Sequence, residues 1–216
     1  MRLKACIFDL DGTLLDTLGD IAAAMNRALA LYGYPAIPTL RYKTMVGRGL
    51  DLLIERILSG RERKADIIRK LRQEFGKQYL LHCTDTTVPY PGIPELLGQL
   101  TARELPLAVL SNKPHEMMTK IVSRLLSSWS FRVILGAGRQ FPLKPDPAAA
   151  LYIARKITID PAEILFVGDS EADIKTAENA GMYAVGVTWG FRTEKELKQA
   201  GARHLISHPR ELLGLL

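Results

Sequence analysis

The sequence predicts an α/β protein whose parallel sheet is covered by helices on both faces, with a helical-bundle domain inserted after the first strand. From about residue 93 onward, short apolar runs alternate with segments of helical periodicity, which is typical of parallel strands joined by helices. Residues 17–86 have helical periodicity throughout. These patterns predict a core domain formed by residues 1–16 and 87–216, and a helical domain formed by residues 17–86.

The first predicted strand is a short apolar run that ends at Phe8. It is too short for a helix, and the carboxylates Asp9 and Asp11 follow it directly. Gly12 permits a sharp turn, so both carboxylates can approach one small ligand. We therefore expect reactive acids at the carboxyl end of this strand.

The inserted segment contains four predicted helices. Apolar residues recur at three- and four-residue spacing over residues 18–32, which predicts the first helix. Thr39 is a suitable cap for a short second helix. Similar spacing predicts a third helix over residues 50–58, ending near Gly60, and a fourth from about Glu62 to His82. Together these helices predict a small bundle.

The remainder of the chain returns to the core through a connector at residues 89–92, which is rich in Pro and Gly. The predicted strands of this part cover residues 107–110, 131–135, 164–167, 184–187 and, as an edge strand, 204–206. The predicted helices cover residues 93–103, 114–126, 147–156, 170–181, a segment from about Thr193, and a terminal segment. Asp146 is expected to cap the third of these helices, with Pro147 at its first position.

Composition limits the location and the partners of this 216-residue chain. Its apolar runs are far shorter than a membrane span, and the first residues lead into a strand instead of a signal-peptide core. We therefore expect a cytoplasmic protein without a membrane partner, present as a monomer or a homodimer. Cys6 and Cys83 have no metal-type spacing and are not expected to form a disulfide.

The net charge of +6 is concentrated in the helical segment. Residues 17–87 hold 12 Lys and Arg against 7 Asp and Glu, whereas the rest of the chain is nearly balanced. Aromatic residues are not interleaved with these basic residues, which argues against a nucleic-acid surface. We interpret the excess as a solvated helical surface or as a field that attracts small anions.

Three predicted strands end in polar groups: Asp9 with Asp11, Ser111 with Asn112, and Asp169 followed by Asp173. In an open, Rossmann-like parallel sheet, the carboxyl ends of neighbouring strands line one crevice, so these groups are expected to converge. Clustered carboxylates repel one another unless a cation lies among them, and oxygen ligands without His or Cys suit Mg²⁺. Asp9 and Asp169 are expected to bind Mg²⁺ directly, and Asp173 directly or through water.

The same groups predict phosphoryl transfer through an aspartyl phosphate. Asp9 is the expected nucleophile, and Asp11 is expected to protonate the leaving oxygen and then to deprotonate the hydrolytic water. Ser111 and Asn112 offer donors to anionic oxygens, and Lys144 before Pro145 adds a positive charge.

These residues resemble the four motifs of the haloacid dehalogenase superfamily of phosphohydrolases over essentially the whole chain. The matching segments are Asp9-Leu10-Asp11-Gly12-Thr13, Ser111-Asn112, Lys144-Pro145 and Gly168-Asp169-Ser170-Glu171-Ala172-Asp173. The resemblance implies the same residue roles, with the Asp11 backbone carbonyl as a further Mg²⁺ ligand and Thr13 as a substrate contact. It also implies that the helical insertion is a cap domain, and the second aspartate, Asp11, favours phosphate chemistry over dehalogenation.

Within the superfamily, the chain most resembles phosphoglycolate phosphatases, which implies 2-phosphoglycolate as the substrate. The segments that carry this resemblance are Asp16-Thr17, Asp20-Ile21, Val46-Gly47-Arg48-Gly49, Pro89-Tyr90-Pro91-Gly92 and Trp189-Gly190-Phe191. Arg48 is expected to meet a substrate carboxylate, because guanidinium binds carboxylate in a bidentate way. The segment 136–143 lacks an acidic residue that is common in this subfamily.

Several alternatives share these motifs. Pyrophosphatases, nucleotidases and other sugar-phosphate phosphatases use the same chemistry, and a phosphosugar mutase similar to β-phosphoglucomutase returns the phosphoryl group to a sugar. A non-enzymatic receiver domain also combines acids, a hydroxyl and a lysine. That class lacks Asp-x-Asp-Gly-Thr and the helical insertion, so it fits the sequence poorly.

Overall fold

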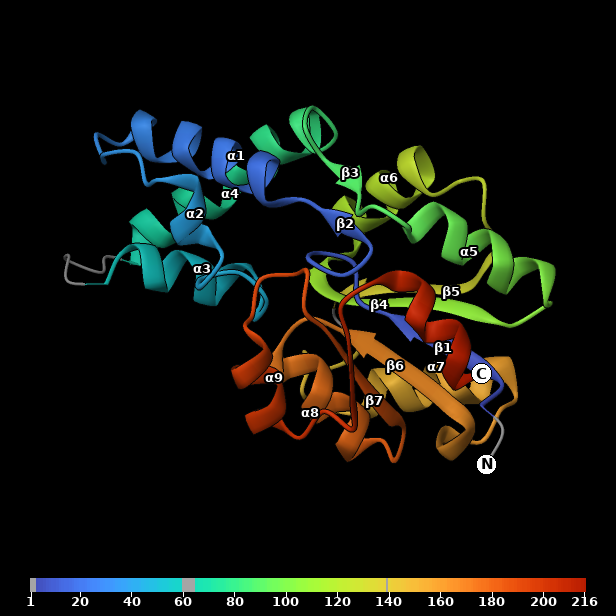
Figure 1. Cartoon of the computed structure of the whole chain (residues 1–216). Coiled ribbons are helices and arrows are strands. Elements are labelled where there is room, and N and C mark those ends of the chain that lie inside the picture. Colours follow the sequence, from blue (N-terminus) through green and yellow to red (C-terminus); the bar gives the residue numbers. More distant parts are fainter. Residues whose placement is uncertain (1–2, 60–64, 139) are drawn as a thin grey trace.

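A parallel six-stranded sheet lies at the centre of the described chain (Figure 1). The structure is a computed structural model that describes residues 3–59, 65–138 and 140–216. The strand order is β5-β4-β1-β6-β7-β8, and each neighbouring pair is parallel. The strands are β1 (Ala5–Phe8), β4 (Leu107–Pro114), β5 (Phe131–Ala137), β6 (Ile164–Gly168), β7 (Tyr183–Val187) and β8 (His204–Ile206). The predicted sheet is therefore confirmed.

Helices cover both faces of the sheet, as predicted. Successive residues of β1 contribute to opposite faces: Cys6 and Phe8 pack with α5 and α6, whereas Ala5 and Ile7 pack with α7 and α8. The helices that cover the two faces of the sheet are α5 (Ile93–Ala102), α6 (His115–Leu125), α7 (Ala148–Ile157), α8 (Glu171–Asn179) and α9 (Glu194–Ala200). None of the helices in the described ranges combines the length and the apolarity needed to cross a membrane.

Strand β4, helix α7 and the terminal segment differ from the prediction in ways that have a physical reason. Strand β4 continues beyond Leu110 to Pro114, because Pro114 pairs with Ala137 of β5 after a shift in register. Helix α7 begins one residue later than predicted, although the Asp146 carboxylate accepts a hydrogen bond from the Ala148 N–H at 2.8 Å, as an N-cap does. The predicted terminal helix is a 3₁₀ segment, Pro209–Leu215, in which the Glu211 N–H donates to the His208 carbonyl.

The inserted segment forms a second layer of helices to one side of the sheet (Figure 1). Helices α1 and α4 pack together through buried apolar side chains, including Met25, Leu71 and Phe75. The helices of this layer are α1 (Leu18–Leu31), α2 (Thr39–Tyr42), α3 (Leu50–Ile57) and α4 (Ala65–His82). The predicted boundaries at Gly60 and Glu62 lie outside the described residues.

The two chain segments that join the layers pair with each other. Strand β2 (Leu15–Asp16) leaves the core, β3 (Val88–Pro89) returns to it, and the two are antiparallel. The predicted connector at residues 89–92 thus begins with a strand residue. Figure 1 shows the pair of strands β2 and β3 between the helical layer and the sheet.

Asp20 ties the start of α1 to the segment just before β3. Its carboxylate is buried and accepts hydrogen bonds from the backbone N–H and the hydroxyl of both Thr86 and Thr87, at 2.6–3.1 Å. Burial opposes ionisation of Asp20, but these hydrogen bonds outweigh burial and lower the pKa of the carboxyl. The contact therefore requires an ionised Asp20.

We expect Asp20→Asn to lower the free energy of unfolding by about 1–3 kcal/mol at pH 7, because the amide nitrogen cannot accept these hydrogen bonds. The folded pKa of Asp20 lies below its unfolded value of about 3.9. Its contribution is therefore complete above that unfolded value and disappears as the pH falls through the folded pKa. Urea unfolding between pH 3 and 7 measures both effects. The exposed neighbour Asp85→Asn is the control, and equal losses in the two variants would contradict the prediction.

Candidate active site

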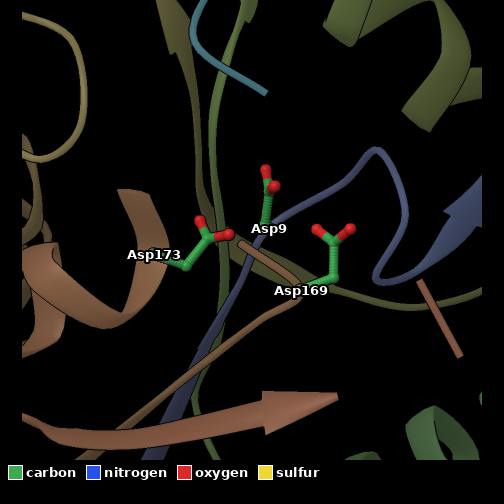
Figure 2. A group of neighbouring side chains, drawn as sticks. All are labelled: Asp9, Asp169 and Asp173. Carbon is green, nitrogen blue, oxygen red and sulfur yellow. The ribbon is translucent and has the colours of Figure 1, made fainter. Parts of the chain in front are cut away.

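Four acids come together where β1 and β6 end. Asp9 and Asp11 follow β1, Asp169 follows β6, and Asp173 lies in the first turn of α8. One carboxylate oxygen from each of Asp9, Asp169 and Asp173 lies within 4.8 Å of the others. Figure 2 shows these three side chains reaching from separate segments toward a shared space. The structure therefore brings together acids that are about 160 residues apart in sequence.

Two glycines permit this close approach. Gly12 has a φ of +84°, and a Cβ there would lie 2.4 Å from the Asp169 carboxylate. A Cβ at Gly168 would lie 2.2 Å from the Cβ of Asp173. A larger residue at either position would displace an acid of the cluster.

Lys144 provides the positive charge inside this cluster. Its ammonium lies 2.9 Å from Asp9 Oδ1 and 2.5 Å from Asp173 Oδ1, and all three side chains are buried. Asn112 fixes the Lys144 backbone by accepting from its N–H at 2.8 Å and donating to its carbonyl at 3.1 Å. Burial alone would lower the pKa of Lys144, but attraction to Asp173 and Asp9 outweighs burial and raises that pKa.

Two carboxyls of the cluster, Asp9 and Asp169, ionise less readily than ordinary acids. Burial, followed by repulsion from Asp173, raises the pKa of Asp9 to about 7 despite the nearby Lys144. Burial and repulsion from Asp173 and Asp9 also raise the pKa of Asp169. One buried ammonium is therefore insufficient to compensate three carboxylates, and the site favours a further cation.

The donor set fits a hard divalent cation. Asp9 Oδ1 is buried, and its 2.9 Å ion pair with the Lys144 ammonium lacks the geometry of a hydrogen bond, which leaves a lone pair that a cation can use. Asp169 is oriented by the Phe191 N–H, at 2.7 Å from its Oδ2. All three cluster members offer oxygen atoms, as Mg²⁺ and Ca²⁺ prefer. The residues present can therefore hold a metal ion.

Asp173 is more constrained than its partners. Its Oδ2 accepts from the N–H and the hydroxyl of Ser170 at 3.0 and 2.6 Å, while its Oδ1 accepts from Lys144. The Ser170 contacts form a capping box at the start of α8. Asp173 thus holds the helix terminus and orients Lys144 at the same time.

Asp11 contacts a second lysine that the sequence analysis did not single out. The Lys113 ammonium lies 2.8 and 3.0 Å from the two Asp11 carboxylate oxygens, and both side chains are largely buried. The Thr17 hydroxyl also donates to Asp11 at 2.7 Å. One sequence signal was available, since Lys113 directly follows the predicted site residues Ser111 and Asn112.

The three remaining core residues that the sequence predicts for substrate binding lie beside the acids. Ser111 and Asn112 line the cavity described below. Thr13 is buried, and its hydroxyl lies 3.4 Å from Asp169 Oδ1. Its carbonyl accepts from the Trp189 indole at 3.0 Å, which anchors the first motif to the loop after β7.

A cavity opens above Asp9 between the sheet and the helical layer. Its empty space, including the mouth, is about 510 Å³. Acids, polar groups of β4 and apolar side chains of the helical layer line it: Asp9, Asp11, Ile21, Val46, Gly47, Gly49, Leu50, Leu53, Phe75, Ser111, Asn112, Lys113, Pro114 and Met117. The wall opposite the acids is therefore mainly apolar.

Arg48 does not belong to this lining. Its guanidinium pairs with Glu171 of α8, and its side chain is 47% exposed. The neighbouring loop residues reach the core by other contacts: Asn112 donates to the Gly47 carbonyl at 3.2 Å, and Arg192 donates to the carbonyls of Lys43 and Val46. The loop around Arg48 is therefore held against the core at the edge of the cavity.

Comparisons with known proteins agree with this geometry. A family model described as haloacid dehalogenase-like hydrolase matches residues 6–187. The N-acetylmuramic acid 6-phosphate phosphatase of Pseudomonas aeruginosa is 35% identical over 100% of this chain and 96% of its own length. The phosphoglycolate phosphatase of Yersinia pestis is 33% identical over 98% of this chain and 92% of its own length.

Solved structures give the same result. The structure of a predicted phosphoglycolate phosphatase from Haemophilus somnus has a TM-score of 0.92 at 30% identity and covers 99% of this chain and 98% of its own. The family match extends from β1 through β7 and includes every acid of the cluster. The chain thus belongs to the haloacid dehalogenase-like hydrolases, among which it is a phosphoric monoester hydrolase.

Proposed function

We propose that this phosphatase hydrolyses a small phosphate monoester, with 2-phosphoglycolate as the first candidate, through a phosphorylated Asp9 and with Mg²⁺ as its cofactor. The observation that carries the proposal is the position of Asp9. It lies at the floor of a cavity, beside Lys144 and Asp169, and Asp11 lines the same cavity. A nucleophile, a proton carrier and a fixed cation are thus available to one bound ester.

In the proposed first step, an Asp9 oxygen forms a bond to phosphorus while the bond between phosphorus and the ester oxygen breaks. Asp11 gives a proton to that ester oxygen. In the second step, Asp11 takes a proton from water, and the water oxygen displaces Asp9 from phosphorus to release inorganic phosphate. Lys144, Ser111 and Thr13 supply positive charge and donors around the transferring group.

The proposed Mg²⁺ ligands are Asp9, Asp169 and the backbone carbonyl of Asp11, with Asp173 directly or through water. Bound Mg²⁺ would neutralise negative charge on the phosphoryl oxygens. The Asp9 Oδ1 atom, which accepts no hydrogen bond of good geometry beside its ion pair with Lys144, supports Asp9 as a ligand, whereas both Asp173 oxygens already accept hydrogen bonds. This difference supports a water-mediated contact for Asp173.

Two relatives suggest two substrates. The phosphoglycolate phosphatase of Yersinia pestis supports 2-phosphoglycolate. N-acetylmuramic acid 6-phosphate is the second candidate, because the corresponding phosphatase of Pseudomonas aeruginosa matches the whole chain. The apolar wall of the cavity, formed in part by Leu53, Phe75 and Met117, also suits a sugar with an N-acetyl group and a lactyl ether.

The test is phosphate release from a substrate panel with Mg²⁺ and with EDTA. The panel contains 2-phosphoglycolate, N-acetylmuramic acid 6-phosphate, pyrophosphate, mononucleotides and hexose phosphates. A preference for one of the first two esters identifies the substrate. Preference for pyrophosphate or a nucleotide would select those alternatives, and no release from any ester, with conversion of a sugar phosphate, would select the mutase.

Arg48 provides a separate prediction. Since its guanidinium pairs with Glu171 outside the cavity lining, we expect Arg48→Met to lower kcat/KM for 2-phosphoglycolate by less than about threefold, as for an exposed ion pair. Steady-state kinetics of Arg48→Met and of the partner variant Glu171→Gln measure this effect. A loss of tenfold or more in Arg48→Met alone would assign the substrate carboxylate to Arg48, as the sequence predicts.

A further inference from the structure

We propose that Lys113 recognises a negatively charged group on the leaving half of the substrate. The inference rests on the proposed phosphatase function and adds a specificity-determining residue to it. It predicts that the enzyme prefers phosphate esters with a carboxylate near the ester oxygen over neutral esters of the same shape.

The Lys113 ammonium lies at the cavity wall beside Asp11. Lys113 lines the cavity, is 7% exposed, and lies 2.8 and 3.0 Å from the two oxygens of Asp11. An ammonium has three N–H groups, and the described residues provide these two acceptors for it. Its remaining donor is available to a bound anion beside the proposed proton carrier.

The described lining of the cavity offers no second cationic side chain. Among the described residues that line the cavity, Lys113 is the only lysine or arginine. Lys144 is engaged with Asp9 and Asp173, and Arg48 pairs with Glu171 outside the lining. A carboxylate that enters this partly apolar cavity requires a charged partner, because a buried unpaired charge is strongly disfavoured.

The spacing of Ser111 and Lys113 along β4 matches the length of a small phosphate ester. Ser111 and Lys113 both line the cavity and are two residues apart in one strand, which corresponds to about 7 Å. A phosphate beside Ser111 therefore leaves Lys113 within reach of a group one or two carbons beyond the ester oxygen. 2-Phosphoglycolate carries its carboxylate one carbon beyond the ester oxygen, as this spacing requires.

Tyr79 of α4 holds Lys113 from the side of the helical layer. The Lys113 ammonium lies 4.4 Å from the centroid of the Tyr79 ring, and that ring stacks on Phe75. A cation over an aromatic face is attracted by the ring. The contact fixes the lysine at the cavity wall, between the helical layer and Asp11.

The experiment compares two esters that differ by one charge: 2-phosphoglycolate and the phosphate ester of glycolamide. For the unmodified enzyme, we expect kcat/KM to be at least about tenfold higher for the carboxylate. For Lys113→Met, we expect kcat/KM for the carboxylate to fall by about 30-fold or more, and the ratio between the esters to approach one. A merely structural lysine would lower both values equally.

The control is Lys175→Met, which removes an exposed lysine paired with Glu178 and leaves the ratio unchanged. Equal turnover of the two esters by the unmodified enzyme, or an unchanged ratio in Lys113→Met, would overturn the inference. Equal turnover of the two esters by the unmodified enzyme overturns the inference even if the Lys113→Met variant does not fold. Failure of the proposed function is distinguishable, because it would appear as absence of Mg²⁺-dependent phosphate release from every ester.

Discussion

Asp9→Asn is expected to lower kcat by at least about 10⁴-fold with every phosphate ester, because an amide cannot serve as the nucleophile. Asp9 lines the cavity, and its Oδ1 lies 2.9 Å from the buried Lys144 ammonium. Single-turnover kinetics measure the loss, and mass spectrometry of acid-quenched enzyme detects the covalent phosphoryl group.

Two controls separate chemistry from folding. Asp51→Asn makes the same change at an exposed ion pair with Arg72 and should retain full activity. Thermal unfolding should show that Asp9→Asn is folded, since the substitution removes one of three clustered buried charges. A variant that kept more than about a tenth of kcat, or a covalent phosphoryl group on another residue, would exclude Asp9 as the nucleophile.

Metal removal is the second large effect. We expect EDTA to abolish phosphate release and Mg²⁺ to restore it, because one ammonium cannot balance the carboxylates of Asp9, Asp169 and Asp173 together with an anionic ester. Mg²⁺ should also stabilise the fold, by about 2.7 kcal/mol at a concentration one hundred times its Kd. Phosphate release and thermal unfolding across an Mg²⁺ titration measure both effects.

Asp169→Asn tests whether both effects arise at this cluster. The variant should require much more Mg²⁺ for activity, and its melting temperature should respond little to the ion. The control is Asp160→Asn, since the exposed Asp160 caps the 3₁₀ segment before β6 and thus lies at the opposite end of this strand from Asp169. Full activity in EDTA, or an equal thermal response in Asp169→Asn, would place the metal requirement elsewhere.

The sheet could be predicted from the sequence because its strands are short apolar runs that end at recognisable polar or turn residues. The run before Asp9 is completely buried, and the run before Gly168 likewise. The acids were predictable for a related reason: each follows a strand, and parallel strands deliver their carboxyl ends to the same edge. Local pattern and global topology therefore agree at these residues.

The contacts between layers could not be read in this way. Lys113 follows Asn112 in sequence, yet its environment comes from Asp11 and from Tyr79 of α4. Arg48 was expected at the substrate because guanidinium binds carboxylate, but the direction of its side chain depends on Glu171. Such contacts depend on how the helical layer docks on the sheet, which no local pattern specifies.

The sequence also contains a local signal for the orientation of Asp173. The sequence Ser170-Glu171-Ala172-Asp173 has the spacing of a capping box, which predicts that Asp173 bonds back to Ser170. The structure has this box. The box explains why Asp173 is more constrained than Asp9.

The central place of β1 has a consequence for synthesis of the chain. This strand pairs with β4 on one side and β6 on the other, so its neighbours are made about 100 and 160 residues after it. The helices of the helical layer all lie within residues 18–82 and can pack together earlier, whereas non-local strand pairing is slow. A ribosome-bound chain shorter than 173 residues lacks part of the acid cluster, so the nascent protein acquires its chemistry only after about four fifths of the chain has been made.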